Sequence, residues 1–241
     1  MATVEVKELA KVISEKIIVD RISFSVEGGE VFGLLGANGS GKTTTFNMLS
    51  GLLRPSSGTV KILGKSIDKN KDFKRDIGFV TQQDSFYETL TVRENLEFFA
   101  SQFGIGGRQA KEKVNTLLEQ IRLTNKAETL ASRLSGGMRK RLNMGCSLVH
   151  DPKIIFLDEP TVGLDPVVRR EIWKVIQELH QMKKTIIITS HYMEEVEHLC
   201  GRVAIMYAGR IVASGTPAQL KKKYKLKQME DVFAYLIKPA V

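Results

Sequence analysis

The chain has 241 residues, of which 42% are hydrophobic and 26% charged, and these proportions are ordinary for a soluble globular protein. No apolar run reaches the ~18–20 residues that a bilayer crossing needs, and no signal peptide is expected, because no basic region precedes a long apolar stretch at the N-terminus. Cys146 and Cys200 are too few for a disulfide framework and match no metal-ligand spacing. We expect both to be buried, reduced thiols.

The formal net charge is +9, and part of it is concentrated near the C-terminus. A basic excess favours nucleic acid or an anionic membrane face as a partner. A solvated helix face produces the same pattern, and for this cluster alone it is the favoured interpretation. The cluster consists of Lys221, Lys222, Lys223, Lys225 and Lys227.

Segments with strand-like and helix-like apolar patterns alternate along the chain, which predicts an α/β fold. Several of the expected strands are continuous apolar runs, as in sheets buried on both faces. The expected strands cover residues 22–26, 31–35, 59–63, 77–81, 154–158, 185–189, 202–206 and 210–213.

Residues 83–150 differ from their surroundings, because their patterns are mostly helical. Thr91 and Glu94 form a capping-box pattern, a second helix is expected over 108–121, and a third follows Ser135. Strand-like segments resume at Ile154, so we interpret this region as a helical insertion within a single domain. The α/β core would then comprise about 1–82 and 151–215, and residues 216–241 would form a helical basic tail.

The stretch from Gly36 to Thr43 fits the phosphate-loop pattern G-x-x-x-x-G-K-[ST] between an expected strand and a helix expected over 44–53. Glycines let backbone N–H groups point at phosphate oxygens, and the helix adds the positive end of its dipole. Lys42 can reach the terminal phosphates and the Thr43 hydroxyl can bind Mg²⁺. A glycine-rich turn with a chance lysine is the alternative. The expected nucleotide-binding residues here are Gly36, Ala37, Asn38, Gly39, Ser40, Gly41, Lys42, Thr43 and Thr44.

Two carboxylates end the expected strand 154–158. Successive strand side chains point to opposite sides, so Asp158 and Glu159 can take different roles. We predict that Asp158 binds Mg²⁺, through water, and that Glu159 polarises the water that attacks the γ-phosphate. A helix cap or a turn after a buried strand is the alternative.

Other polar residues follow expected strands at the edge where α/β sheets bind ligands. His191 is predicted to contact the γ-phosphate or the catalytic water, and Gln82 to hold a Mg²⁺ ligand position or that water. A lone histidine at a strand end is more often structural, and an exposed loop glutamine is the alternative for Gln82. Asp165 is a candidate helix cap before Pro166.

A second anion-binding candidate begins the helix after residue 134. Ser135 can cap this helix, while Gly136 and Gly137 expose N–H groups to an anion. A plain helix cap gives the same pattern, so these residues alone do not decide between the two.

These motifs occur in the order GANGSGKT, Gln82, LSGGM, IIFLDEP, GLDP and SH, which closely resembles the ATP-binding subunits of ABC transporters over about residues 4–217. The resemblance implies a P-loop NTPase (RecA-like) core with an antiparallel β subdomain and an inserted α-helical subdomain. It likens Gln82 to the Q-loop, Ser135 to the signature motif, Asp165 to the D-loop and His191 to the switch histidine. ATP and Mg²⁺ are the implied cofactors.

The resemblance also implies partners. Two such domains pair head to tail, with ATP between the phosphate loop of one and Ser135, Gly136 and Gly137 of the other; both sites look complete in a homodimer. A membrane permease would dock near Asp84, Phe86 and Tyr87, whose aromatic side chains look exposed, although they fit a subdomain core equally well. The expected location is cytoplasmic, at the inner face of the cell membrane.

Two positions depart from the family pattern. Met138 stands where the signature motif usually has glutamine, and methionine cannot supply that amide hydrogen bond. Ile13 stands where an aromatic residue usually stacks on adenine, so an aliphatic contact is expected there. The LSGGM variant is similar to the ATPases of daunorubicin-type multidrug exporters, and the ending from Met229 to Phe233 resembles theirs, which favours export over import.

Three functions are therefore compared. A transport ATPase subunit fits all the motifs. A soluble ABC-type ATPase acting on nucleic acid or a protein assembly fits the basic charge, but no aromatic–basic interleaving suggests base stacking, so no nucleic acid partner is expected. A non-catalytic nucleotide sensor is disfavoured by the presence of Glu159, Gln82 and His191.

Overall fold

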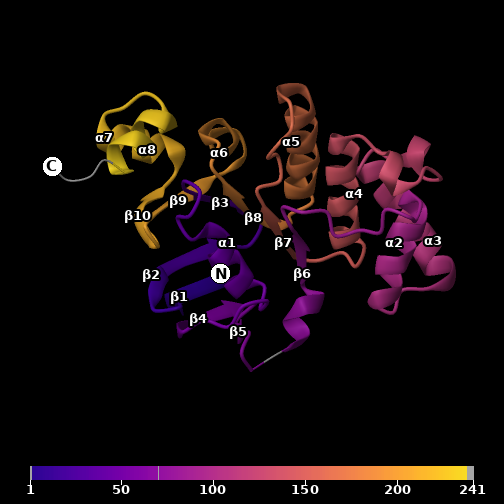
Figure 1. Ribbon diagram of the computed structural model, residues 1–241, viewed down its shortest axis with the longest axis horizontal. Helices are drawn as coiled ribbons and strands as arrows, with labels where there is room; N and C mark the ends of the chain where they lie inside the picture. Colours follow the sequence, from indigo (N-terminus) through magenta and orange to yellow (C-terminus); the bar gives the residue numbers. More distant parts are fainter. Residues whose placement is uncertain (1, 70, 238–241) are drawn as a thin grey trace.

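The computed structural model describes residues 2–69 and 71–237, and two sheets form its framework (Figure 1). The larger sheet has six strands in the order β10-β9-β3-β8-β7-β6. Its strands are β3 (Val31–Leu35), β6 (Ile77–Val80), β7 (Ile154–Asp158), β8 (Thr185–Ser190), β9 (Arg202–Tyr207) and β10 (Arg210–Gly215). All neighbouring pairs are parallel except β9 and β10.

This sheet confirms the expected α/β core. Every residue of β3, β7 and β8 is buried, as the continuous apolar runs predicted. Because β3, β6, β7 and β8 run parallel, their carboxyl ends meet at one edge, where their following loops gather.

The smaller sheet is antiparallel and has the order β2-β1-β4-β5, with β1 (Ala2–Ile13), β2 (Lys16–Glu27), β4 (Ser57–Ile62) and β5 (Lys65–Ser66). Strand β1 was not expected, and the expected strand 22–26 is only the second half of β2. The reason is that β1 is irregular: its pairing register with β2 shifts between Val6 and Leu9, where Glu8 has φ 48°. Such bulges break the alternation by which a strand is recognised.

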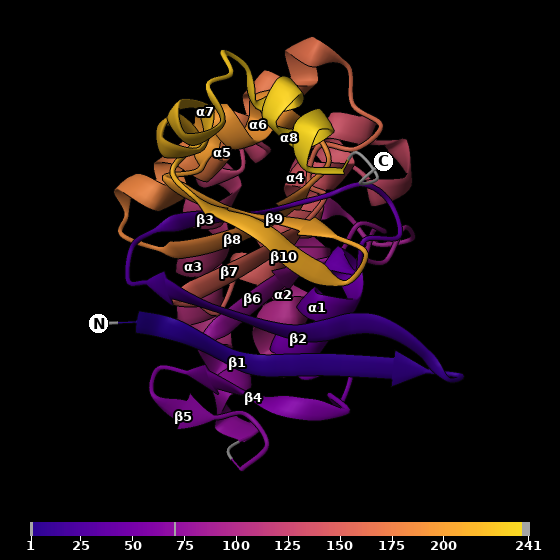
Figure 2. The same ribbon diagram turned by 90° about the vertical axis from the view of Figure 1, so that its left-hand side faces the viewer.

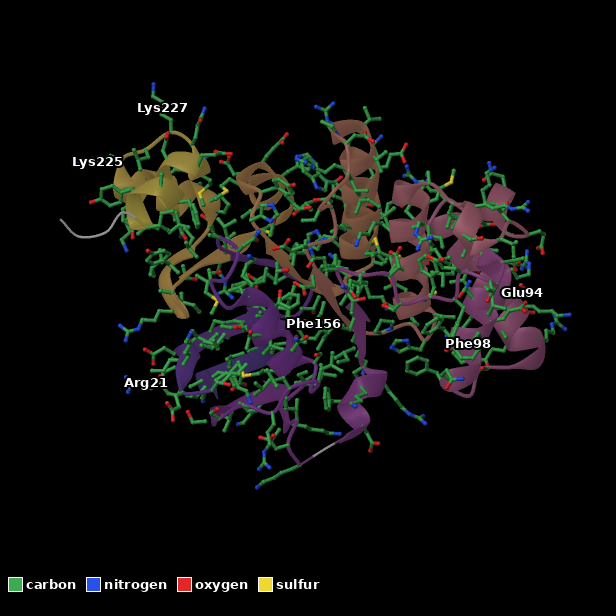
Figure 3. The ribbon with its side chains drawn as sticks, viewed as in Figure 1. Arg21, Glu94, Phe98, Phe156, Lys225 and Lys227 are labelled. Carbon is green, nitrogen blue, oxygen red and sulfur yellow. The ribbon has the colours of Figure 1, made fainter. Side chains whose placement is uncertain are left out.

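Helices cover both faces of the larger sheet (Figure 2). One face carries α5 (Pro166–Gln181), α6 (Met193–Leu199), α7 (Pro217–Tyr224) and α8 (Met229–Ile237). The other face packs on α1 (Lys42–Leu49) and the smaller sheet, through a core that includes Phe156 and Phe46. Phe156 lies in the middle of the molecule (Figure 3), with its ring 5.6 Å from that of Phe46. Helix α1 ends four residues before the predicted end at 53.

Between β6 and β7 the chain leaves the sheet and forms α2 (Val92–Gln102), α3 (Gly107–Gln120) and α4 (Gly136–Leu148), which lie together beside the sheet (Figure 1). The expected capping box is present: Thr91 Oγ1 accepts from the Glu94 N–H, and Glu94 Oε2 accepts from the Thr91 N–H. Short 3₁₀ helices cover Lys71–Arg75, Thr124–Lys126 and Ala131–Arg133. The helical insertion predicted from the sequence is therefore observed.

The C-terminal basic cluster lies on and after α7. Lys225 and Lys227 extend outward at the far end of this part of the molecule (Figure 3), and Lys221 pairs with Glu197. This arrangement is that of a solvated helix face. Residues 238–241 of the expected tail lie outside the described residues.

Cys146 and Cys200 are both buried and unbridged, as expected. None of the helices in residues 2–69 and 71–237 has both the length and the apolar character that a membrane crossing requires.

Candidate functional site

A hollow of about 610 Å³ opens at the carboxyl edge of the larger sheet. It gathers loops that follow β3, β6, β7 and β8, which are distant in sequence. Its lining comprises Ile18, Asn38, Gly39, Gly41, Lys42, Thr43, Thr44, Gln82, Glu159, Val162, His191 and Tyr192. The structure therefore brings together most of the loop residues with Gln82, Glu159 and His191.

The loop after β3 has the geometry of an anion cradle. Gly41 immediately precedes α1 at φ 104° and supplies no side-chain cap, so the first N–H groups of the helix have no intrahelical acceptor. A Cβ on Gly36 would lie 2.5 Å from Ser40 Oγ and from the Met206 carbonyl oxygen, which excludes any larger residue. Within the described residues, the buried Ser40 Oγ has no hydrogen-bond partner. These unpaired donors fit phosphate oxygens.

Lys42 lies across the mouth of this loop and is only 4% exposed. Its ammonium donates to the carbonyl oxygens of Gly36 at 2.8 Å and Ala37 at 3.2 Å. It also lies 3.3 Å from Glu159 Oε1. The buried charge is thus held in place before any phosphate arrives, and Glu159 is its counter-charge.

The two carboxylates at the end of β7 have different surroundings, as the alternation of strand side chains predicted. Asp158 Oδ1 accepts from the Thr189 hydroxyl at 2.6 Å. Burial raises the pKa of Asp158, because the ionised form loses water, and the hydrogen bond from Thr189 opposes this rise. Glu159 has φ 47°, a left-handed conformation that glutamate rarely adopts, and its N–H donates to Thr189 Oγ1 at 2.9 Å.

His191 faces Glu159 from the loop after β8. Its Nδ1 lies 3.3 Å from Glu159 Oε2, although the atoms are not aligned for a hydrogen bond, and this buried nitrogen has no partner among the described residues. Gln82 lines the same hollow, and its carbonyl oxygen accepts from the Lys140 ammonium of α4. Lys42, Glu159 and His191 therefore form a chain of contacts beside the loop.

The signature residues lie elsewhere. Ser135 caps α4, with its Oγ accepting from the Met138 N–H at 3.5 Å, and Gly136 lines a second hollow of about 650 Å³. Asp165 caps α5 by accepting from the N–H groups of Val167 and Val168, each at 3.0 Å. Neither Ser135, Gly136, Gly137 nor Asp165 lines the first hollow. Gln82 and Val162 line both hollows.

The sequence did not reveal three residues of the first hollow, Ile18, Val162 and Tyr192. Ile13, expected near adenine, is 44% exposed at the end of β1 and is not part of the lining. Its contact with adenine stays a prediction. Tyr192 could have been predicted from the sequence, because it follows His191 directly. Ile18 becomes part of the hollow only because β2 packs against the phosphate loop.

The expected docking segment is partly buried. Phe86, which looked exposed in the sequence, belongs to the core, with the Arg139 guanidinium 5.0 Å from its ring centre. Of the two interpretations that the sequence left open, the subdomain core therefore holds for Phe86, and Arg139 of α4 binds both Asp84 and Glu88 on either side of it. Tyr87 is 50% exposed, so only this aromatic remains available to a partner.

A family model described as ABC transporter matches residues 19–162, which include the phosphate loop and both β7 carboxylates. The chain belongs to the ABC transporter family. Its membership favours a transporter subunit over an ATPase acting on nucleic acid. A domain of this family binds ATP, in agreement with the geometry of the loop.

Known ABC proteins resemble this one along nearly all of its length. Nod factor export ATP-binding protein I of Paraburkholderia xenovorans is 44% identical over 220 residues, which are 91% of this chain and 72% of the relative. The probable multidrug ABC transporter ATP-binding protein YbhF of Escherichia coli is 40% identical over 240 residues, 97% of this chain. The chain spans only 41% of the length of YbhF.

The fold of this ABC protein is also that of a solved relative. A structure of an ATP-binding subunit of an ABC transporter superimposes with a TM-score of 0.87 and 26% identity, covering 98% of this chain and 100% of the other. The expected P-loop core with its β and helical subdomains is therefore confirmed.

Proposed function

We propose that this protein is an ATP-binding and ATP-hydrolysing subunit that powers an ABC-type exporter. The observation that carries the proposal is the chain of contacts from Lys42 through Glu159 to His191 beside the phosphate loop. The names of the two relatives, a Nod factor exporter and a probable multidrug transporter, support export. The daunorubicin-type signature LSGGM points the same way.

The loop residues hold the triphosphate in this proposal. The N–H groups at the start of α1 and the Ser40 hydroxyl donate to phosphate oxygens, and the Lys42 ammonium neutralises their charge. Thr43, Gln82 and Asp158 would hold Mg²⁺, which supplies charge stabilisation to the transferring phosphoryl group. Mg²⁺ usually keeps several waters and substrate oxygens as ligands, so a single carboxylate such as that of Asp158 is enough on the protein side.

Glu159 and His191 divide the work on the attacking water. Glu159 accepts a proton from the water at its carboxylate. The hydrogen bond from the Glu159 N–H to Thr189 Oγ1 holds the backbone that carries this carboxylate. His191, 3.3 Å away, has a buried ring nitrogen with no hydrogen-bond partner in the part of the chain that the structure describes, and it would orient the water or the γ-phosphate.

The position of the signature residues supports an active site shared between two subunits. Ser135, Gly136, Gly137 and Asp165 lie outside the first hollow, so a second copy would bring its own signature residues to the ATP bound by the first. Closure then follows from ligand that binds the paired state better than the separate one. A homodimer has two complete sites.

The assembly follows from this arrangement. We divide the single domain into a core of about 1–82 and 151–215, a helical subdomain of about 83–150 and a C-terminal tail of about 216–241. The permease would dock near Asp84, Phe86 and Tyr87, through the exposed ring of Tyr87. The subunit would then lie at the cytoplasmic face of the cell membrane.

The test is Glu159→Gln, which removes the charge and preserves the shape. The variant should bind Mg·ATP as the wild type does, hydrolyse it at a rate lower by at least about 100-fold, and accumulate as a dimer in size-exclusion chromatography with ATP. Glu119→Gln on the exposed surface of α3 is the matched control. Wild-type turnover in Glu159→Gln refutes the role of Glu159, and no affinity of the wild type for Mg·ATP refutes the function.

A further inference from the structure

Glu195 is a buried carboxylate to which the proposed function gives no role. It lies in the first turn of α6 and is 1% exposed. Its Oε1 accepts two hydrogen bonds, from the Thr161 hydroxyl at 2.8 Å and from the Trp173 indole N–H at 3.1 Å. Its Oε2 is buried and has no partner within the described residues.

The first donor belongs to the segment that carries the predicted catalytic carboxylate. Thr161 is fully buried and lies two residues after Glu159. A turn holds this segment: the Val162 N–H donates to the Glu159 carbonyl oxygen at 3.3 Å, and the Leu164 N–H donates to that of Thr161 at 3.2 Å. Movement of Thr161 is therefore transmitted to the backbone of Glu159.

The acceptor belongs to the segment that carries His191. The Tyr192 N–H donates to Ser190 Oγ at 2.9 Å, which fixes the turn between β8 and α6. Helix α6 begins at Met193, so Glu195 is four residues beyond His191 on a short rigid path. The Thr161–Glu195 bond thus connects the two segments behind the Glu159–His191 contact.

Trp173 is the second donor and comes from α5, which lies beside α6 (Figures 1 and 2). Its ring is 4% exposed and stacks on His198 of α6, with 4.8 Å between ring centres. The indole therefore holds Glu195 from a second element, α5.

Fold stability does not explain a carboxylate here. A buried polar oxygen without a partner is costly, and apolar residues of similar size often replace buried charges without loss of stability. The arrangement does explain a geometric role, because Oε1 holds one donor on each of two elements around the catalytic pair.

We propose that Glu195 is a positioning residue, which sets the distance between Glu159 and His191 by binding Thr161 and Trp173 at once. The proposal rests on the proposed ATPase function. It predicts that loss of the Glu195 acceptor lowers kcat and leaves ATP binding intact, because both donors to Oε1, Thr161 and Trp173, lie outside the phosphate loop.

The experiment compares Glu195→Leu, which removes the acceptor, with Glu195→Gln, whose amide oxygen can accept the same two bonds. Glu197→Gln, on the same helix but at the surface, is the control. In Glu195→Leu we expect kcat to fall by about tenfold or more with KM unchanged. In Glu195→Gln we expect kcat to stay close to that of the wild type. Equal kcat in Glu195→Leu and wild type overturns the proposal, as does a parallel loss of kcat and ATP affinity.

A second measurement needs no nucleotide. Trp173 is the only tryptophan of the chain, so the tryptophan emission of the protein reports the surroundings of this one indole, which include Glu195 and His198. Thr161→Val removes the other donor to Oε1, and we expect it to shift the Trp173 emission and to lower kcat as Glu195→Leu does. This variant also serves if Glu195→Leu fails to fold. An unshifted emission in folded Thr161→Val overturns the link, whereas absence of ATP hydrolysis by the wild type refutes the proposed function instead.

Discussion

Replacement of Lys42 by alanine tests how the phosphate loop binds its ligand. The Lys42 ammonium makes two bonds to carbonyl oxygens, at 2.8 and 3.2 Å, and a 3.3 Å contact with Glu159. Phosphate oxygens therefore compete with the Glu159 carboxylate for this ammonium. The free energy gained on ATP binding is then that of one charge-assisted hydrogen bond and not that of an unpaired charge. Such a bond contributes about 1.5–3 kcal/mol, which corresponds to about a 10- to 150-fold loss of ATP affinity in Lys42→Ala.

The assay is calorimetric titration of the purified protein with Mg·ATP. Lys174→Ala, which removes an exposed lysine of α5, should bind as the wild type does. A thermal melt of each variant without nucleotide separates loss of binding from loss of folded protein. Unchanged affinity in a folded Lys42→Ala would show that the loop N–H groups bind ATP without help from the ammonium, and would contradict our reasoning.

Two further predictions concern the second hollow and the effect of pH. Ser135→Arg should bind ATP normally as a monomer but hydrolyse none, since the arginine blocks the paired site. Ser132→Arg is the control and should hydrolyse ATP normally. Normal turnover in Ser135→Arg would exclude a shared site. Burial lowers the pKa of His150, whose ring stacks on Phe103 with 3.7 Å between ring centres. Between this lowered pKa and about 6.5, the ordinary histidine value, the unfolded chain then binds more protons than the folded one. The free energy of unfolding therefore decreases as the pH is lowered through that window. Between pH 7.5 and 5 the unfolding temperature of His150→Phe should decrease by less than that of the wild type. Equal decreases would contradict the lowered pKa of His150.

The sequence was most informative where one residue type is needed by a local backbone geometry. The phosphate loop, the Thr91–Glu94 capping box and the Asp165 cap all depend on neighbours within four residues, and the structure contains each of these local features. The buried strands were recognisable for a similar reason, since a strand covered on both faces has no polar interruption.

It was least informative where position depends on distant parts of the chain. Strand β1 carries charged residues and a bulge, and only its pairing with β2 and β4 makes it a strand. The sequence left open whether Phe86 is exposed or part of a core, because nothing near it shows that Arg139, more than 50 residues later, contacts its segment. Glu195 looked like one more acid of a surface helix, because its partners Thr161 and Trp173 lie on other elements.

The left-handed backbone of Glu159 has a consequence for the selection of variants. Glycine adopts φ 47° without steric cost, and asparagine tolerates it better than glutamate does. A library randomised at this position and selected only for soluble expression should therefore drift towards glycine or asparagine, whereas selection for ATP hydrolysis should retain glutamate. The two selections favour different residues at this one position, because a glutamate in the left-handed conformation makes the turn less stable but places its carboxylate in the site.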